Sequence, residues 1–221
     1  MIIDERMVTY INSLDTGHTP FLENLERTAK QTKVPIIRRE MQSFLKVFLK
    51  MKQPKRILEV GTAVGFSAVF MAQYGEPDAE ITTIENYEKR IPIARENKKK
   101  SGFADHITLI PGDAAEVLKT LDGPYDFIFM DAAKGQYIHF LPEVLRVLDK
   151  NGVLITDNVL QDGDVIESRF AVERRNRTIH KRMREYLFEL THNEGLLTSV
   201  VPLGDGIAIT MKSHEKREET T

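Results

Sequence analysis

The sequence contains no cysteine, no long apolar run and no excess of basic charge, and each absence excludes a class of protein. Without cysteine, neither a disulfide scaffold nor a thiolate metal site can form. The longest nearly unbroken apolar stretch, Phe66–Ala72, is too short to cross a bilayer, so we expect no membrane partner. The net charge of −2 gives no global sign of nucleic-acid binding.

The amino-terminal segment also lacks the features of a secretory signal. In MIIDERMVTY, acids stand where such a signal needs a basic patch followed by an apolar run, so a cytoplasmic protein is expected. The 221 residues are 41% hydrophobic and 29% charged, which is typical of a soluble globular protein. This length predicts one domain over residues 1–221, made of a helical cap (1–54), a ligand-binding core (55–211) and a frayed polar tail (212–221).

Short β-rich runs alternate with helical patterns from Arg56 onward. The middle runs are continuously apolar, which is expected when helices cover both faces of a sheet. Strands separated by helices predict an α/β fold with a doubly wound parallel sheet. The last two runs are joined by Gly204-Asp205-Gly206, too short for a crossover helix, and should pair antiparallel. The predicted strands are Arg56–Val60, Glu80–Glu85, His106–Ile110, Asp126–Met130, Gly152–Asp157, Leu196–Leu203 and Gly206–Met211.

Residues 1–54 carry no strand pattern, and apolar positions recur there at helical spacing. We therefore predict amino-terminal helices packed on the sheet, with Pro54 at the junction. A second apolar stripe indicates a helix between the fourth and fifth predicted strands. The amino-terminal stripe is Ile37, Met41, Phe44, Leu45 and Phe48, and the later one is Phe140, Val144, Leu145 and Leu148.

A glycine-containing turn follows the first predicted strand. Gly61 and Gly65 permit backbone conformations that other residues resist and allow a ligand to approach closely. The turn differs from a dinucleotide fingerprint, because Ala63 occupies the middle position and no third glycine follows, and it is not a P-loop. By itself it is consistent with either a ligand site or an ordinary strand-to-helix turn.

Two acids follow the next two strands at the same edge of the sheet. Glu85 is placed to accept hydrogen bonds from ribose hydroxyls, which favours an adenosine ligand, although an acid at a strand end is also common without one. Asp113 could accept from an adenine amino group or cap the helix predicted over residues 114–121. One carboxylate can do both.

Oxygen-bearing side chains follow the fourth and fifth strands. Because neighbouring parallel strands end about 5 Å apart, Asp131 should face Asp157 and Asn158. Two carboxylates and an amide carbonyl suit Mg²⁺, and a cation would relieve their mutual repulsion. The alternative is a helix cap at Asp131 and an ordinary turn at Asp157-Asn158. Lys134 lies one turn beyond Asp131 and is either a catalytic group or a solvated surface lysine.

In combination and in order, these motifs resemble the Mg²⁺-dependent class I O-methyltransferases of the catechol and caffeoyl-CoA type. The matching segments are ILEVGTAVGFS, Glu85, GDA at 112–114, DAAKGQY, TDNV and VPLGDGIAIT, spread over roughly residues 35 to 211. The resemblance implies a Rossmann-like seven-stranded sheet with an antiparallel last strand, usually in a homodimer. It also implies S-adenosyl-L-methionine (SAM) in the cleft, held by Ile37, Glu59, Gly61, Thr62, Gly65, Ser67, Glu85, Asp113, Ala114 and Asp131.

The same resemblance implies the catalytic groups. Asp131, Asp157 and Asn158 match the family's Mg²⁺ ligands, and Lys134 matches its catalytic lysine beside Asp131. The methyl group of SAM is already activated, so the enzyme must supply a positioned oxygen nucleophile. Any substrate should therefore present two vicinal oxygens, as a catechol does and as 5-hydroxyuridine does through its 5-hydroxyl and C4 carbonyl.

A basic segment follows the predicted metal ligands. Residues 169–184 hold seven Lys or Arg and one acid, a local charge of +6. With its apolar positions on one helical face, the segment predicts outward-pointing basic groups that contact phosphates, as in a tRNA anticodon loop. The alternative is a solvated helix face that pairs with acids of a dimer mate. The predicted tRNA-binding residues are Arg174, Arg175, Arg177, Lys181 and Arg182.

As a whole, the sequence looks similar to bacterial tRNA 5-hydroxyuridine O-methyltransferases, which form 5-methoxyuridine at the wobble position. We therefore predict this activity, with a small-molecule catechol or caffeoyl-CoA-like O-methyltransferase as the main alternative. A SAM-dependent RNA-binding protein without catalysis is disfavoured, because a pure binder does not need the Asp131/Lys134/Asp157/Asn158 set. A dehydrogenase is disfavoured by the missing third glycine.

Overall fold

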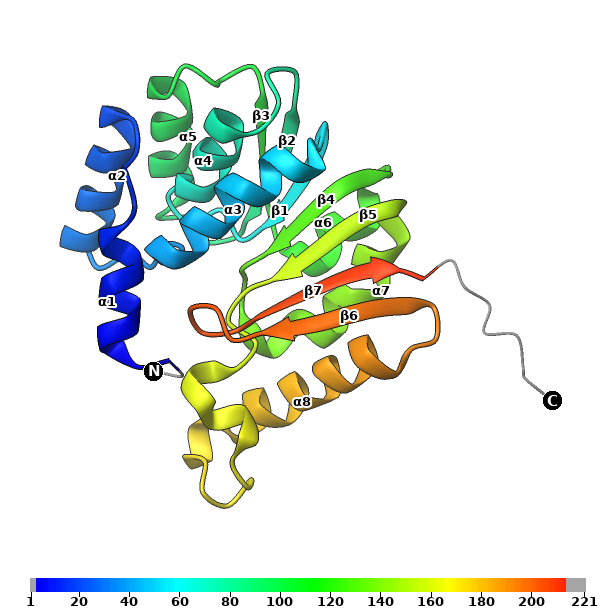
Figure 1. Ribbon diagram of the computed structural model, residues 1–221. Helices are drawn as coiled ribbons and strands as arrows, with labels where there is room; N and C mark the ends of the chain where they lie inside the picture. The colour runs from blue at the N-terminus through cyan, green and yellow to red at the C-terminus, as the bar shows by residue number, and fades with distance from the viewer. Residues whose placement is uncertain (1–2, 214–221) are drawn as a thin grey trace.

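Seven strands form one mixed sheet in the order β3-β2-β1-β4-β5-β7-β6, in a computed structural model that describes residues 3–213 (Figure 1). β7 pairs antiparallel with both β5 and β6, and the other neighbouring strands are parallel. This arrangement confirms the predicted α/β fold with a doubly wound, Rossmann-like sheet and a reversed last strand. The strands are β1 Arg56–Val60, β2 Glu80–Glu85, β3 Ile107–Pro111, β4 Tyr125–Met130, β5 Leu148–Thr156, β6 Leu196–Val201 and β7 Ile207–Lys212.

Helices cover both faces of the sheet, and alternate strand residues enter two cores. Ile57 packs with α2, α3 and α4, whereas the next residue, Leu58, packs with α6, α7 and α8. The helices are α1 Glu5–Ser13, α2 Pro20–Gln31, α3 Arg39–Lys52, α4 Phe66–Tyr74, α5 Ile91–Lys100, α6 Ala114–Thr120, α7 Tyr137–Val147 and α8 Arg177–His192. Short 3₁₀ turns are η1 Lys134–Gln136, η2 Gln161–Ile166 and η3 Arg174–Asn176.

Most of the predicted strand boundaries differ from the observed ones by one or more residues, and three differences in helix or strand ends have a clear local reason. Ile37 is buried but precedes α3, because the helix begins only after the extended residue Arg38. Leu148 keeps its place in the core, yet its backbone pairs with Tyr125 and so opens β5 instead of ending α7. Lys212, which we predicted to lie in a frayed tail, is the last residue of β7 and pairs with Leu196 of β6. The rest of that predicted tail, from residue 214 on, lies outside the described residues.

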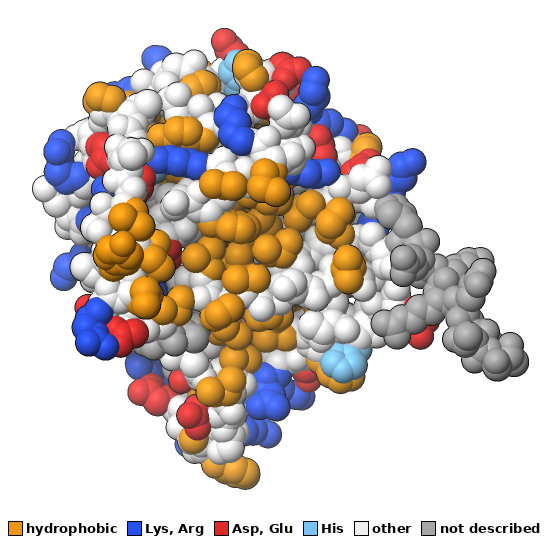
Figure 2. Space-filling model, in the orientation of Figure 1, with side chains coloured by type: hydrophobic (Ala, Val, Ile, Leu, Met, Phe, Trp, Pro, Cys, Tyr) orange, Lys and Arg blue, Asp and Glu red, His pale blue; other side chains and the backbone are white. Residues whose placement is uncertain are grey.

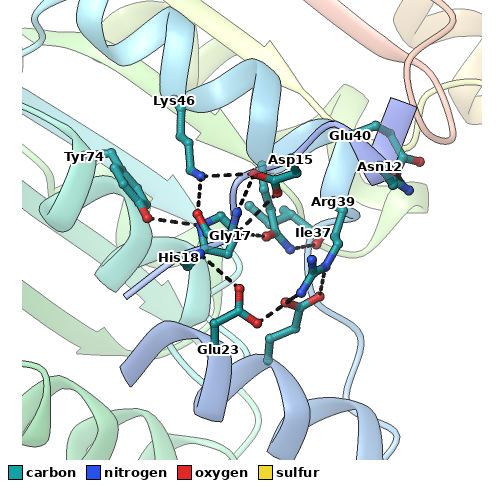
Figure 3. A network of polar contacts seen from close by, with 12 residues as sticks. Asn12, Asp15, Gly17, His18, Glu23, Ile37, Arg39, Glu40, Lys46 and Tyr74 are labelled. Atoms are coloured by element: carbon teal, nitrogen blue, oxygen red, sulfur yellow. Dashed lines mark hydrogen bonds and ion pairs between the residues drawn. The ribbon is translucent and has the colours of Figure 1, made fainter. Parts of the chain in front are cut away.

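A largely buried polar network ties the amino-terminal segment to α4, which packs on the sheet (Figure 3). The His18 ring lies between the Tyr74 hydroxyl (3.1 Å from Nδ1) and the Gln42 amide oxygen (2.6 Å from Nε2). The Gln42 amide nitrogen donates to the carbonyl oxygen of Ile37 at 2.8 Å. The network therefore fixes residues 35–38, which run along the cleft described below, against α3 and α4.

His18 and two nearby glutamates are residue types that bind metal ions, but protein groups already occupy or neutralise them. The ligand atoms of His18, Glu23 and Glu26 lie within 4.8 Å of one another. Both ring nitrogens of His18 are already hydrogen-bonded, however, and Arg39 forms ion pairs with both glutamates at 3.1 and 2.9 Å. The cluster is neutralised by protein groups, so we interpret it as structural.

One face of the sheet carries an exposed apolar area. Among the helices of the described residues, none covers β6 and β7 on the side that faces the viewer in Figure 1, and Figure 2 shows apolar side chains gathered across the centre of that view. We call this area the open sheet face; it includes Val47 and Met51 of α3, Leu197 and Val201 of β6, and Ile209 and Met211 of β7. Within residues 3–213, no helix has both the length and the apolar character to cross a membrane.

Candidate functional site

A cleft of about 770 Å³ opens at the carboxyl ends of the central strands. The loops that follow β1 to β5 line it, together with residues 35–38. This is the edge at which open α/β sheets bind ligands. The structure brings most of the sequence-predicted cofactor residues to its wall: Ile37, Gly61, Thr62, Ser67, Glu85, Asp113, Ala114 and Asp131 line the cleft, whereas Glu59 and Gly65 do not.

The glycine turn brings two strand ends into contact. Gly61 has φ +106°, and a Cβ at this position would lie 2.1 Å from the carbonyl oxygen of Asp131, so no larger residue fits. Gly65 caps α4 and packs on Ala94 of α5, which gives it a helix-packing role away from the cleft. Ala63 adopts a left-handed conformation with φ +48°, and its N–H donates to Glu85 at 2.7 Å. Backbone strain of this kind is concentrated at ligand sites.

Glu59 lies fully buried beneath the cleft. One of its carboxylate oxygens, Oε2, accepts a hydrogen bond from the Thr83 hydroxyl. The other, Oε1, has no hydrogen-bond partner of normal geometry among the described residues. Burial raises the pKa of Glu59 to about 7, against the lowering influence of the Ser67 and Thr83 hydroxyls. A buried acceptor without a partner is suited to a donor group on a ligand.

Glu85 and Asp113 are both oriented by backbone groups. Glu85 accepts from the N–H groups of Ala63 (2.7 Å) and Tyr87 (2.8 Å), one at each oxygen, so its carboxylate is held at the cleft wall with further lone pairs available. Asp113 caps α6 by accepting from the Ala115 N–H at 2.8 Å, and it also lines the cleft. The cap and the ligand-facing position are thus combined in one residue.

The predicted metal ligands lie together at the other end of the cleft. The Asn158 side-chain amide nitrogen donates to Asp131 Oδ1 at 2.9 Å, which leaves the amide oxygen of Asn158 for another partner. Asp157 Oδ1 accepts from the Asn158 N–H at 2.7 Å. Asn158 has φ +61°, a left-handed conformation that asparagine tolerates better than most residues. The turn therefore presents two carboxylates and one amide oxygen.

The two carboxylates are costly to keep charged together. Burial raises the pKa of Asp131, against the lowering effects of Asn158 and Lys134. Burial, followed by repulsion from Asp131, raises the pKa of Asp157 to about 7. An all-oxygen set with two buried acids fits a hard divalent cation, whose charge would favour the ionised forms.

Tyr137 supports this turn, although the sequence analysis did not assign it a role. Its buried hydroxyl lies 3.2 Å from the carbonyl oxygens of Ala132 and Asp157, and its one proton is shared between them. It therefore holds the ends of β4 and β5 at a fixed separation. The only sequence signal was its place in the DAAKGQY motif.

Lys134 is paired rather than simply solvated. Its Nζ lies 2.8 Å from Asp205 Oδ2, and Asp205, in the turn between β6 and β7, is only 2% exposed. Asp205 also accepts from the Asp162 N–H in η2, and Asp162 lies 3.6 Å from the Arg38 guanidinium. Asp205 therefore connects Lys134 with η2, and Asp162 of η2 in turn lies close to Arg38 on the other side of the cleft. The sequence analysis placed Asp205 in a short connection and in the VPLGDGIAIT segment but gave it no role.

The basic segment lies beside this site, but only some of its charges point freely outward. Arg182 donates to the Gly135 carbonyl at 3.1 Å and so joins α8 to η1. Arg177 donates to carbonyl groups of the preceding loop, Arg175 pairs with Glu173, and Lys181 pairs with Glu185. The expectation that the basic groups all face solvent is thus wrong in part, because the loop before α8 needs donors for its carbonyls. Arg174 forms no ion pair with the described residues.

Comparisons with known proteins agree with this geometry. A catechol O-methyltransferase from Mycobacterium tuberculosis is 29% identical over 160 residues, which cover 71% of this chain and 73% of that protein. Caffeoyl-CoA O-methyltransferase 1 of Arabidopsis thaliana is 31% identical over 182 residues, with coverages of 75% and 67%.

Solved structures match over nearly the whole chain. A Staphylococcus aureus protein described as a candidate caffeoyl-CoA O-methyltransferase is 32% identical, with a TM-score of 0.87 over 95% of this chain and 100% of that one. A methyltransferase of Podospora anserina, solved with S-adenosylhomocysteine (SAH) bound, is 27% identical, with a TM-score of 0.86 and coverages of 95% and 94%. The family model described as O-methyltransferase matches residues 12–213. The chain therefore belongs to the O-methyltransferase family.

Proposed function

We propose that the cleft binds SAM and that the enzyme transfers its methyl group to a substrate oxygen. One observation carries the proposal. The glycine turn, the acid Glu85 held by backbone N–H groups, and the three oxygen-bearing side chains after β4 and β5 all lie in the same cleft. Glu59, whose Oε1 forms no hydrogen bond of normal geometry among the described residues, suits the charged amino group of a methionine moiety, and Glu85 suits ribose hydroxyls. The SAH-bound Podospora relative supports the same ligand class.

The triad of Asp131, Asp157 and Asn158 would hold Mg²⁺. This assignment rests on the buried, mutually repelling carboxylates and on the Asn158 amide oxygen that the turn leaves available. Bound there, the ion would lower the pKa of a substrate hydroxyl and orient it together with a neighbouring oxygen. Isothermal titration with Mg²⁺ should show binding that Asp157→Ala abolishes, and turnover should stop in chelator; full activity in chelator would contradict the assignment.

The chain's own residues position the reacting oxygen. Lys134, held by Asp205, donates a hydrogen bond to it, while Asp131 and the Tyr137-supported turn fix its direction. The substrate oxygen then attacks the methyl carbon, so that a C–O bond forms as the C–S bond breaks. The sulfur keeps the electron pair of the broken bond, giving SAH, and the hydroxyl proton passes to solvent or to a general base.

We propose 5-hydroxyuridine at the wobble position of tRNA as the substrate, methylated in the cytoplasm to 5-methoxyuridine. The exposed Arg174 and the basic helix α8 beside the cleft support a polyanionic partner, and an anticodon loop offers unpaired bases. A small ortho-diol is the alternative, favoured by the names of the catechol and caffeoyl-CoA relatives. Either substrate presents the two vicinal oxygens that the triad requires.

A direct assay separates these substrates. Purified enzyme with SAM and Mg²⁺ would be given tRNA that carries 5-hydroxyuridine, or a free catechol, and the methylated nucleosides and phenols would be measured by mass spectrometry. We expect a much higher kcat/KM for tRNA. Methylation of catechol with no methylation of tRNA would overturn the tRNA proposal and leave the O-methyltransferase chemistry intact.

We also propose a homodimer that pairs through the open sheet face. Apolar patches of this kind mark interfaces, and an uncharged face can meet its own copy across a two-fold axis without like-charge contacts. Sedimentation velocity should show a dimer that Leu197→Asp converts to monomer. A wild-type monomer at micromolar concentration would contradict this proposal.

A further inference from the structure

The loop before α8 has an unusual combination of internal support and outward apolar side chains. We call residues 165–173 the α8 loop; it projects beyond the body of the molecule below α8 in Figure 1. Phe170 is 86% exposed and Ile166 is 81% exposed. Of the large hydrophobic side chains in residues 3–213, these two are the most exposed, and they lie only four positions apart.

Buried side chains at both ends and hydrogen bonds from α8 hold the loop in one conformation, so Phe170 is exposed at a fixed position. Buried Val165 and Val172 anchor its two ends. Arg177 of α8 donates to the carbonyl groups of Val172 (3.1 Å) and Phe170 (3.4 Å). Further along α8, the His180 ring lies 3.2 Å from the Glu167 carbonyl oxygen. Two side chains of the helix thus satisfy three loop carbonyls and fix the position at which Phe170 is presented.

Charges of both signs flank the tip. Glu167 and Glu173 lie in the loop, and Glu173 pairs with Arg175, whereas Arg169 and Arg174 form no ion pair with the described residues. An aromatic side chain flanked along the chain by guanidinium groups without ion pairs matches an unstacked base with phosphates on either side. Stacking a base on Phe170 would also remove its exposed apolar surface from water, which favours binding.

We propose that Phe170 is a stacking platform for an unpaired base of the RNA substrate, adjacent to the base that is methylated. The inference rests on the proposed tRNA function and adds to it a specificity-determining residue. The α8 loop begins at the edge of the site, because η2 leads into it from Asp162, whose N–H donates to Asp205. Ile166 forms a second apolar contact beside the stacked base.

The test compares two substrates that share the same reacting base. One is an anticodon stem–loop RNA carrying 5-hydroxyuridine, and the other is the free 5-hydroxyuridine nucleoside. For Phe170→Ala we expect the ratio of kcat/KM for RNA to that for nucleoside to fall roughly 5- to 100-fold, since stacking on an aromatic side chain contributes about 1–3 kcal/mol per base. Phe170→Trp should retain the wild-type ratio. Phe170→Leu should lose it, because leucine keeps apolar area without a π face.

Matched controls separate the failure of this inference from failure of the function. Phe188→Ala removes a phenylalanine that is 60% exposed but lies on α8 and not in the loop. Its ratio of kcat/KM for RNA to that for nucleoside should equal the wild-type ratio. If the wild type does not methylate the RNA, the proposed function fails. If the RNA is methylated but Phe170→Ala behaves like Phe188→Ala, only the stacking role fails. Loss of dimerisation, or of binding to anionic lipid vesicles, in Phe170→Ala with an unchanged ratio would assign the loop to a different partner.

Discussion

The cleft is rich in acids and the segment before and within α8 is rich in arginine, and the fold positions these two sets of charged residues differently. In the cleft, Asp131 and Asn158 come from adjacent strand ends, and the sheet itself brings them within 2.9 Å. In the basic segment, no sheet dictates the positions, and Arg177 and Arg182 instead satisfy backbone carbonyls. A charged residue at a strand end can therefore be assigned a chemical role from sequence more readily than one on a surface helix.

The largest expected effect comes from the metal triad. Asp157→Ala should reduce Mg²⁺-dependent turnover by more than about a thousandfold, since several kcal/mol of charge stabilisation are removed. Affinity for SAM, measured by calorimetry without Mg²⁺, should change little. Asp105→Ala, which alters an exposed acid outside the cleft, is the control. Comparable activity of Asp157→Ala and the control would end the metal hypothesis.

Asp205 should have the next largest effect, because it holds Lys134 without lining the cleft itself. Asp205→Asn should lower kcat about 10- to 100-fold, as is typical for groups that orient a catalytic residue. The KM for SAM should remain close to the wild-type value. Asp205→Glu should recover part of the rate. An equal fall in kcat for both variants, with lowered thermal stability in both, would instead indicate a purely structural role.

The two kinds of arginine can be distinguished directly. Replacing Arg169 and Arg174 by alanine should weaken RNA binding, with little change in Tm. The slope of log K for RNA binding against log salt concentration should become less steep by about 2. Arg177→Ala should lower the stability by about 1 kcal/mol through the lost loop hydrogen bonds, which is a few degrees in Tm. Salt-dependent binding assays and thermal unfolding would measure both. Identical profiles for the two changes would remove the distinction.

A further expected effect is a pH dependence of stability without metal. Asp157 has a pKa near 7 when folded and an ordinary carboxyl value of 3.8 when unfolded. Between these values the folded protein binds more protons, so its free energy of unfolding falls as pH rises and levels off above about pH 7. Mg²⁺ should therefore raise Tm more at pH 8 than at pH 5.5, as measured by thermal unfolding. A pH-independent Mg²⁺ shift, equal to that of Asp157→Asn, would contradict this expectation.

The sequence predicted the fold and the cleft because both follow from local patterns. Continuous apolar runs separated by helical patterns located the strands. Parallel strands then place the residues that follow them at one edge of the sheet. The partner of Lys134 could not be found in this way, since Asp205 is 71 positions away and the contact depends on the reversal of β7. The bracing role of Arg177 was hidden for a similar reason: it depends on the loop conformation, which no periodicity encodes.

The insertion of β7 between β5 and β6 has a consequence for how the chain is assembled. Synthesis proceeds from the amino terminus, so β6 leaves the ribosome before the strand that joins it to the sheet. The turn with Asp205 lies between these two strands, and β7 alone connects it to β5 and the rest of the sheet. The contact that holds Lys134 therefore depends on the last strand to be synthesised, whereas the glycine turn and the oxygen triad lie wholly in earlier segments.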